Sequence, residues 1–511
     1  MCPQASRLQP PASSLKPRPF ILFCLAVYVG AAFAGCGESG VDSLQPRQVR
    51  AAPPDEQVIG AATSGPTADQ DGPPSDLRTR RTGSDWPQFL GPTGDGKSPE
   101  TGIRTDWPET GLPIIWQRQL GEGYGMPTVS RGRLFQFDRV GDEARLVCLE
   151  SETGRELWQF KYPTDYTDLY GYSGGPRCSP VVDGNRVYLF GAEGMLHCVR
   201  AADGKPLWRV DTAEQFGVVQ NFFGVGSTPV IEGDLLIAQI GGSPMESQSV
   251  PPGALDQVVG NRSGIVAFDK RTGAVRYQIT DELASYAAPV LATIGPRRWC
   301  FVFARGGLVG FNPADGKVDF HYPWRARMLE SVNASNPVVV DDTVLISETY
   351  GPGSSLLRVR PGGYDVVWAD PARSRTKSLM THWNTPIHVG GFVYGSSGRH
   401  TVDAELRCIE LATGKVRWSV PELSRSSLLY VDGHFVCLTE YGTLMLIKAN
   451  PDRFELIAEV TMRAAENGPS APGVNSRRLL EYPAWAAPIL SHGLLYVRGK
   501  DRLVCLELIP R

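Results

Sequence analysis

The sequence predicts an all-β protein, an eight-bladed β-propeller, because one pattern of short strands recurs eight times from Trp116 to the C-terminus. Each repeat has a proline-led strand, a polar turn, an apolar strand, a glycine-rich turn and a third strand, followed by a turn that leads to an aromatic residue. Roughly 42 to 69 residues separate equivalent positions of successive repeats, which suits a four-stranded propeller blade with loop insertions. The 56 glycines and 41 prolines fit many short strands and tight turns better than long helices.

The strands of each repeat are bounded by recurring residue types. The opening prolines stand at Pro127, Pro180, Pro229, Pro289, Pro337, Pro386 and Pro488, and the seventh repeat has Leu428-Leu429 instead. The closing aromatic residues are Trp158, Trp208, Tyr277, Phe320, Trp368 and Trp418, with Phe454 in the seventh repeat. A Thr-Gly or Asp-Gly pair before the fourth strand is hairpin-turn chemistry, since glycine tolerates positive φ, and it occurs at Thr153-Gly154, Asp203-Gly204, Thr272-Gly273, Asp315-Gly316 and Thr413-Gly414.

The first and last strands of the repeat region complement each other. The eighth repeat ends after Leu503-Val504-Cys505-Leu506 without a fourth strand, whereas Gly111 to Trp116 has the form of a fourth strand with no blade before it. Pairing these segments closes the ring and removes the exposed edges of an open array. We therefore expect an N-terminal strand to complete the last blade.

The first 36 residues are expected to be a signal peptide rather than part of the fold. Basic residues precede an apolar run from Phe20 to Ala34, which is shorter than the roughly 20 residues of a membrane span. Ala32-Phe33-Ala34 is a site for the general signal peptidase, and Phe33-Ala34-Gly35-Cys36 resembles a bacterial lipobox with Phe33 where leucine is usual. Plain secretion and lipidation at Cys36 are therefore the two alternatives.

The composition of residues 37–84 favours lipidation at Cys36. This stretch is rich in Pro, Gly, Ala, Ser and charge, with almost no large apolar residues, so it reads as a disordered tether between a lipid and a globular body. The predicted organisation is a signal peptide over 1–36, a tether over 37–84 and the propeller over 85–511. We expect a lipid-anchored protein of the cell envelope that faces the periplasm or the exterior.

The repeat resembles that of pyrroloquinoline-quinone-like (PQQ-like) propellers. The pattern Gly-x-Leu-x-(Ala/Cys)-Leu-(Asp/Glu)-x-x-Thr-Gly-x-x-x-Trp is clear from Leu146 to Trp158, from Leu196 to Trp208 and from Leu406 to Trp418. Asp85 to Pro92 looks like the leader of such propellers in planctomycete-type bacteria. The resemblance covers about four-fifths of the chain and implies two branches, the quinoprotein alcohol dehydrogenases and the non-catalytic propeller lipoprotein of the outer-membrane β-barrel assembly machinery.

Several other functions find little support in the sequence. A formal charge of −3 and a pI of about 6.2 do not favour nucleic acid as a partner. The cysteines at one repeat position, such as Cys148 and Cys198, fit small apolar strand residues, and without a C-x-x-C motif no zinc site is expected. No disulfide is expected either, because matching strands of adjacent blades should splay too far apart for the roughly 7 Å between Cα atoms that the bond needs. Gly171 to Gly175 matches a G-x-S-x-G nucleophile elbow but leads into a strand instead of a helix, so it is read as a loop.

The candidate binding residues share one predicted face of the ring. Loops after the second strand of each blade and loops leading into each blade should surround the central channel on the same side, where polar and aromatic residues can meet a ligand or partner. Polar rim residues are also simply solvated in any propeller. The candidates are Asp138, Tyr172, Glu193, Asn221, Tyr286, Arg305, Asn333, Glu348, His382, Trp383, Asn384, Glu440, Trp485 and Lys500, with Phe222 and Asn336 beside them.

Three functions remain open, and no catalytic residue is assigned. The first is a non-enzymatic, monomeric scaffold that binds envelope proteins and demands no cofactor or metal. The second, implied by the resemblance, is a quinoprotein dehydrogenase of alcohols or sugars with PQQ and Ca²⁺, in which Glu348 and Asn333 are possible metal ligands, although the adjacent cysteines and C-x-x-C-H haem motif of such enzymes are missing. The third is a carbohydrate or small-molecule binder that uses Trp383 and Trp485 as stacking platforms.

Overall fold

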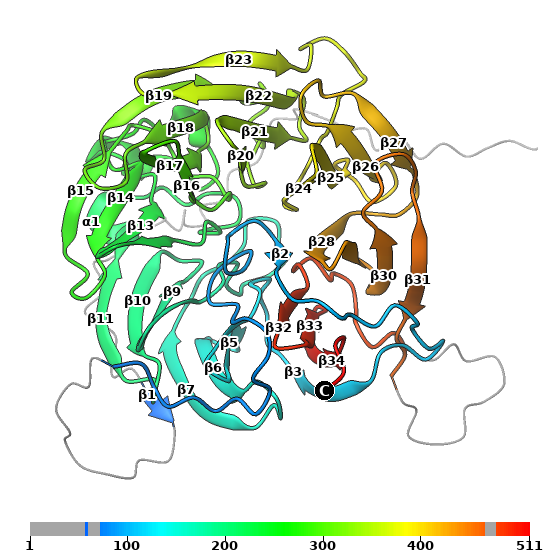
Figure 1. Cartoon of the computed structure of the whole chain (residues 1–511). Helices are drawn as coiled ribbons and strands as arrows, with labels where there is room; N and C mark the ends of the chain where they lie inside the picture. The colour runs from blue at the N-terminus through cyan, green and yellow to red at the C-terminus, as the bar shows by residue number, and fades with distance from the viewer. Residues whose placement is uncertain (1–56, 60–71, 465–476) are drawn as a thin grey trace, which may run out of the picture. The chain divides into compact units, whose positions relative to one another are not determined.

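The computed structural model describes residues 57–59, 72–464 and 477–511, all within the compact unit from Pro53 to Arg511. The expected signal peptide, Cys36 and the tether residues 37–56 and 60–71 lie outside the described residues. Within the described part no helix is long and apolar enough to cross a membrane. The described chain is almost entirely β-structure, in eight sheets arranged as the blades of a ring (Figure 1). The predicted eight-bladed propeller is therefore confirmed.

Each blade is an antiparallel sheet whose four main strands follow one another from the centre of the ring outwards. Blades 1 to 4 consist of β4 (Thr128–Ser130), β5 (Arg133–Val140), β6 (Glu143–Glu150) and β7 (Glu156–Pro163); β8 (Val181–Asp183), β9 (Arg186–Phe190), β10 (Met195–Arg200) and β11 (Pro206–Asp211); β12 (Val230–Glu232), β13 (Leu235–Gln239), β14 (Ile265–Asp269) and β15 (Val275–Ile279); and β16 (Val290–Ile294), β17 (Arg297–Phe303), β18 (Gly307–Phe311) and β19 (Val318–Pro323).

Blades 5 to 8 consist of β20 (Val338–Val340), β21 (Thr343–Glu348), β22 (Gly353–Arg360) and β23 (Gly363–Ala369); β24 (Ile387–Val389), β25 (Phe392–Ser397), β26 (Glu405–Glu410) and β27 (Val416–Val420); β28 (Ser426–Val431), β29 (His434–Thr439), β30 (Thr443–Lys448) and β31 (Leu456–Thr461); and β32 (Ile489–Ser491), β33 (Leu494–Arg498), β34 (Arg502–Glu507) and β3 (Ile114–Gln119). The remaining elements are β1 (Gln57–Ile59), β2 (Lys97–Ser98), α1 (Thr212–Phe216), η1 (Met245–Ser249) and η2 (Leu255–Gln257).

The ring closes through β3, as predicted. This strand pairs antiparallel with β34, and Trp116 stands opposite Cys505. The predicted prolines directly precede the inner strands of seven blades, where a residue without an N–H donor breaks no ladder hydrogen bond. Because β3 comes from the N-terminal side of the repeats and β34 from the C-terminal side, the last blade joins the two ends of the ring.

Neighbouring blades are locked by the closing aromatic residues. The ring of Trp158 in blade 1 lies so close to the Asp203-Gly204 turn of blade 2 that a Cβ on Gly204 would stand 2.6 Å from it. In the same way the indole nitrogen of Trp116 donates to Ser151 O at 2.9 Å, beside Gly154. Glycine is therefore required at these turns for two reasons, a positive φ and the aromatic ring above it.

The two faces of the ring differ in their connections. The loop face carries the loops between second and third strands and the loops that lead into each blade, whereas the turn face carries the remaining short turns. Residues 72–110, which we call the strap, lie on the turn face. Trp86 bridges to Val129, and β2 pairs parallel with β28, so the strap reaches the inner strands of blades 1 and 7 (Figure 1).

Part of the expected tether belongs to this folded strap. Leu77 donates its N–H to Arg131 O, and Arg80 forms an ion pair with Glu507 near the C-terminus. The predicted boundary at Asp85 is therefore too late, because residues 76–84 contact blades 1 and 8. Composition indicated a tether here since the segment has few apolar residues, but charged side chains hold it instead.

Candidate functional site

The candidate residues lie on loop-face connections from several blades, but most of their polar groups are already bound within the protein. Asp138 in β5 is fully buried and accepts hydrogen bonds from Arg145 at 2.9 and 2.7 Å and from the Gly121 N–H at 2.7 Å. Glu440, also fully buried, pairs with Arg425 at 2.6 Å and accepts from the Trp485 indole at 3.1 Å. Burial raises the pKa of Glu440, but these contacts outweigh burial and hold the pKa below its ordinary value.

The acidic groups elsewhere on this face follow the same rule. Asp168 pairs with Arg177 at 2.6 Å. Asp256 accepts from Arg305 at 2.9 Å and from Arg325 at 2.8 Å. These arginines therefore neutralise acidic side chains that the fold places beside them.

Glu348 and His382 are titratable groups on adjacent blades, with Glu348 buried and His382 partly buried. Burial raises the pKa of Glu348 to about 7, while its oxygens accept from Ser331 Oγ at 2.9 Å and from the Gly351 N–H at 3.1 Å. Burial lowers the pKa of His382 to about 3, and its Nε2 lies 3.1 Å from the Tyr350 hydroxyl. At pH 7 His382 is therefore neutral, and Glu348 is partly protonated.

The candidate amides join loops to one another. Asn333 donates to Ala304 O at 2.7 Å. The other amides also bond the main chain. Asn221 donates to Ala284 O at 3.0 Å and Asn384 donates to Ser396 O at 2.9 Å, whereas Asn336 accepts from the Ala288 N–H at 2.8 Å. These side chains hold the loop face in shape, which sequence reasoning could not distinguish from ligand binding.

Glu193 and Lys500 are the remaining polar candidates. Glu193 accepts from Tyr162 and Thr164 at 2.8 and 3.2 Å, between blades 1 and 2, and burial raises its pKa. Lys500 is exposed on blade 8.

An aromatic belt runs across the loop face. One part links Tyr441, Tyr482, Trp485, Trp383, His382 and Tyr350 through ring contacts of 4.7 to 6.1 Å. The other part contains Tyr170, Tyr172, Phe222, Phe223 and Tyr286. Tyr124 joins the two, because it lies 4.8 Å from Trp485 and under Arg177, which in turn stands over Phe223.

Sequence reasoning located half of this belt. It selected the correct loops but missed Tyr124, Tyr170, Phe223, Tyr350, Tyr441 and Tyr482. All of these lie in or beside loops that lead into a blade or that follow a second strand, so collecting every aromatic residue of those loops would have found them.

The exposed hydrophobic side chains distinguish the two faces. Within the described residues, the exposed large hydrophobic side chains lie either on outer strands or on the loop face, and none lies on the turn face. Those of the loop face are Val140, Leu169, Tyr170, Tyr172, Met245, Val259, Val402, Tyr441 and Tyr482. Tyr172 is 59% exposed, so part of the aromatic belt reaches solvent.

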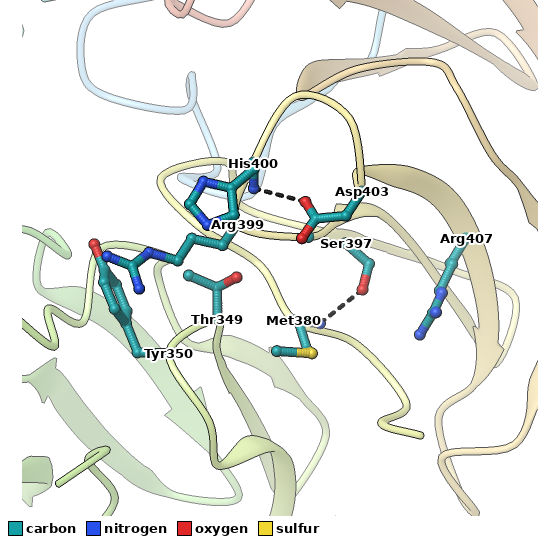
Figure 2. A pocket seen from close by; sticks show the side chains of 9 residues that line it. Thr349, Tyr350, Met380, Ser397, Arg399, His400, Asp403 and Arg407 are labelled. Carbon is teal, nitrogen blue, oxygen red and sulfur yellow. Dashed lines mark hydrogen bonds between the residues drawn. The ribbon is translucent and has the colours of Figure 1, made fainter. Parts of the chain in front are cut away.

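A pocket of about 280 Å³ opens between blades 5 and 6 beside the belt. Thr349 and Tyr350 follow β21, Arg399, His400 and Asp403 lie between β25 and β26, and Figure 2 shows these side chains around the space. Its lining is completed by Met380, Ser397, Gly398 and Arg407.

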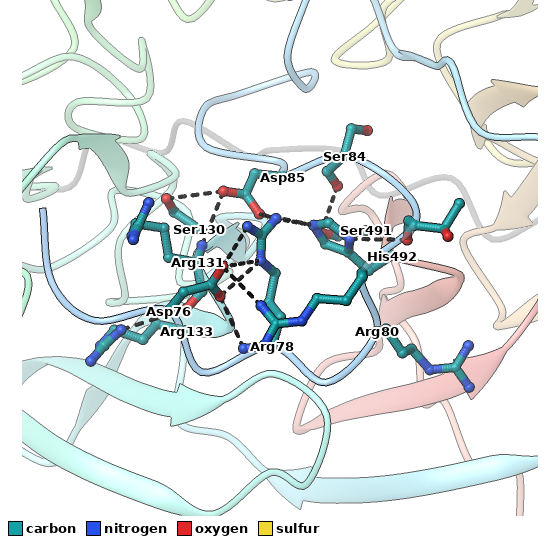
Figure 3. A network of polar contacts seen from close by, with 12 residues as sticks. Asp76, Arg78, Arg80, Ser84, Asp85, Ser130, Arg131, Arg133, Ser491 and His492 are labelled. Carbon is teal, nitrogen blue, oxygen red and sulfur yellow. Dashed lines mark hydrogen bonds and ion pairs between the residues drawn. The ribbon is translucent and has the colours of Figure 1, made fainter. Parts of the chain in front are cut away.

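The turn face has a polar network where the strap meets the ring (Figure 3). Arg78 binds Asp76 through two nitrogens, and this hydrogen bonding holds the pKa of Asp76 well below its usual range. His492 is 4% exposed, and its Nε2 lies 2.9 Å from the Arg78 guanidinium and 3.0 Å from Asp85 Oδ1. This cluster fixes the strap to blade 8.

The donor set does not fit Ca²⁺ with a quinone. That pair needs carboxylate and amide oxygens free to coordinate the ion, but Asp138 and Glu440 are in ion pairs and both oxygens of Glu348 accept hydrogen bonds. Asn333 Oδ1 has no partner among the described residues. Across residues 57–59, 72–464 and 477–511, no three or more His, Cys, Asp and Glu side chains are grouped as metal ligands.

The protein is therefore a closed eight-bladed propeller, in which each sequence repeat forms one blade and aromatic side chains gather on the loop face. The family model described as outer membrane protein assembly factor BamB matches residues 142–420, slightly more than half of the chain. The chain belongs to this family of PQQ-like repeat propellers.

Solved structures share the fold at low sequence identity. The quinohemoprotein alcohol dehydrogenase from Comamonas testosteroni is 12% identical with a TM-score of 0.55, over 84% of this chain and 81% of that chain. BamB from Moraxella catarrhalis is 13% identical with a TM-score of 0.49, over 78% of this chain and 97% of that chain. No curated protein matches the sequence. At 12% identity, the likeness to the alcohol dehydrogenase shows the fold alone.

Proposed function

We propose that this protein is a non-enzymatic propeller of the cell envelope whose loop face binds other proteins. The observation that carries the proposal is the restriction of exposed hydrophobic residues, outer strands apart, to the loop face of the described chain. Exposed apolar groups gathered on one face mark interaction surfaces, and Tyr, Trp and Arg are enriched in the energetic centres of protein interfaces. Membership of a family described as an assembly factor supports the same function.

A lipid on Cys36 would hold this face near its partners. The apolar run up to Ala34 and the composition of residues 37–71 support an anchored, extracytoplasmic protein. Replacement Cys36→Ser should then release the protein from the membrane fraction and end its labelling by radioactive fatty acid. Retention of both properties would contradict the anchor.

Site-specific photo-cross-linking tests the docking face directly. A photoreactive residue is placed at Tyr172 or Tyr482 on the loop face of the full-length protein in its native membrane, with Arg271 and Lys415 on the turn face as matched controls. We expect both loop-face positions to capture the same protein and the turn-face positions to capture none. Capture by the turn face alone, or no protein adduct at either loop-face position, would contradict the proposal.

The quinoprotein alternative has less support. The carboxylates that would hold the ion are occupied, and the donor arrangement in the described chain offers no free set. Incubation of the purified protein with PQQ and Ca²⁺, followed by dye reduction with alcohols or sugars, distinguishes the two functions. We expect no turnover above that of free quinone, and sustained turnover would reverse the ranking.

The stacking-platform alternative has less support, because its two principal residues contact other side chains of the protein. The ring centroids of Trp383 and Trp485 lie 4.7 Å apart, so the two indoles pack against each other. The guanidinium carbon of Arg425 lies 4.5 Å from the Trp383 ring centroid. Their ring faces are thus used in contacts within the protein. A sugar would have to displace these contacts before it could stack.

A further inference from the structure

The pocket between blades 5 and 6 contains an arginine without an acidic partner among the described residues. Arg399 stands 4.4 Å over the Tyr350 ring, and its only side-chain hydrogen bond within the described residues is a 3.8 Å contact to Met328 Sδ. Five other arginines of the loop face pair with Asp or Glu, namely Arg145, Arg177, Arg305, Arg325 and Arg425. The guanidinium carries five N–H donors in a planar fork, so most of its donors remain available.

A buried hydroxyl faces the same space. Thr349 is 3% exposed, and its Oγ1 has no hydrogen-bond partner among the described residues. Figure 2 shows this oxygen turned away from Tyr350 towards the middle of the pocket. Ser397 Oγ accepts from the Met380 N–H at 2.9 Å, which leaves its own hydrogen to donate. A buried polar atom without a partner is costly to the fold unless a ligand satisfies it.

The charges around the pocket select the kind of anion. Arg407 is paired with Glu405 at 3.1 Å and also donates to Lys377 O. Asp403, at the rim, accepts from the His400 N–H at 2.7 Å and adds a negative charge. Arg399, which has no ion pair among the described residues, therefore matches a single negative charge, whereas the second charge of a phosphate dianion would add to the repulsion from Asp403.

We propose that this pocket binds a carboxylate group, held by the planar fork of Arg399 with the Thr349 hydroxyl as an additional donor. The carboxylate comes either from a protein docked on the loop face, as an acidic side chain or a chain terminus, or from a small organic acid. Only the first source rests on the proposed docking function.

The binding test uses the full-length protein with the α-amide of N-acetyl-L-glutamate, which carries a single carboxylate, as probe and the corresponding diamide as uncharged control. Titration calorimetry should give a Kd on the order of 1 mM for the carboxylate, as suits a single anchored group, and no binding of the diamide. Arg399→Gln should weaken binding about tenfold or more, and Arg399→Lys should retain part of it. Arg360→Gln, an exposed arginine of β22, is the matched control and should leave the Kd unchanged.

Thr349→Val distinguishes a ligand role from a structural role. Because the hydroxyl has no partner within the described residues, its removal should leave the Tm unchanged or higher, while binding weakens about threefold to tenfold. A lower Tm with unchanged binding would show that Thr349 serves the fold. The carboxylate proposal is overturned if wild-type protein does not bind the probe, or if Arg399→Gln binds it equally well.

Cross-linking then identifies the source without making the two proposals depend on each other. Tyr172 does not line the pocket, so its adduct reports docking independently. If Arg399→Gln reduces that adduct and the probe competes with it, the carboxylate belongs to the partner. If the adduct persists while Arg399→Gln still abolishes binding of the probe, the ligand is a small organic acid.

Discussion

The loop face and the turn face are built from the same repeats but differ in what covers them. On the turn face the strap lies on the ring, with Trp86 buried to 1% exposure and His492 to 4%. On the loop face Tyr172 is 59% and Tyr482 is 44% exposed. The comparison indicates that one face completes the fold, while the other has side chains that the fold itself does not require.

The difference has a physical basis in the apolar cores. The largest apolar cluster combines blades 7, 8 and 1, and Trp86, Leu90 and Ile103 of the strap belong to it. The strap thereby reinforces the blades that meet where the ring closes. Within the loop face, ion pairs such as Arg425 with Glu440 organise the loops, and the aromatic rings around them extend towards solvent.

The largest expected effect is the loss of the buried strap indole. Trp86→Ala should lower the free energy of unfolding by about 3 to 5 kcal/mol, because it opens a cavity under the turn face. Equilibrium denaturation measures the change. A decrease in the free energy of unfolding below about 1 kcal/mol would mean that packing of the strap on the ring contributes little to stability.

Glu348 should make stability depend on pH in a defined direction. Burial raises its pKa in the folded state to about 7, above its ordinary value, so folding favours the protonated form. Stability from this group is fully present below pH 4.5 and falls as the pH rises towards 7. Glu348→Gln should therefore be more stable than wild type by about 2 to 3 kcal/mol at pH 8, with little difference at about pH 4. Equal differences at both pH values would exclude a raised pKa.

The inter-blade glycines should be more sensitive than other glycines with positive φ. Gly204→Ala should cost about 1 to 3 kcal/mol because its methyl group meets the Trp158 ring. Gly184, with φ of 60° and no atom within 4 Å of an added Cβ, is the matched control and should cost about 1 kcal/mol. Thermal unfolding of the two variants side by side checks the difference. Equal losses of stability would mean that the Trp158 ring does not constrain Gly204.

The smallest effect on stability is expected on the loop face. Tyr172→Ser combined with Tyr482→Ser should change the free energy of unfolding by less than about 1 kcal/mol, since both side chains are exposed. The same variant should lose its partner on co-purification from native membranes. Strong destabilisation would mean that these residues serve the fold after all.

The sequence predicted the ring better than the surface. Repeat spacing, the opening prolines and the isolated strand around Trp116 are local signals, and they were sufficient for eight blades and their closure. The strap network was missed because Arg78 meets His492 and Arg80 meets Glu507, pairs that lie at opposite ends of the folded chain in sequence. No composition rule indicates such contacts.

The sequence placed the candidate residues on one face of the ring, but whether they bind a ligand stays a prediction. Whether Asn333 faces a ligand or bonds Ala304 O depends on loop geometry that a linear pattern does not contain. The same is true of Arg425 and Glu440, which neutralise each other. The exposure of Tyr172, on which its proposed role rests, depends on how the assembled blades place its loop.

Hydroxyl-radical footprinting of the protein in intact cells, compared with the purified protein, tests the central claim most directly. We expect Tyr172, Tyr482 and Met245 on the loop face to be oxidised less in cells than in the purified protein. Oxidation of Ile115 and Val366 on outer strands should be the same in both. Equal oxidation of the loop face in both states, or protection confined to the outer strands, would contradict the central claim.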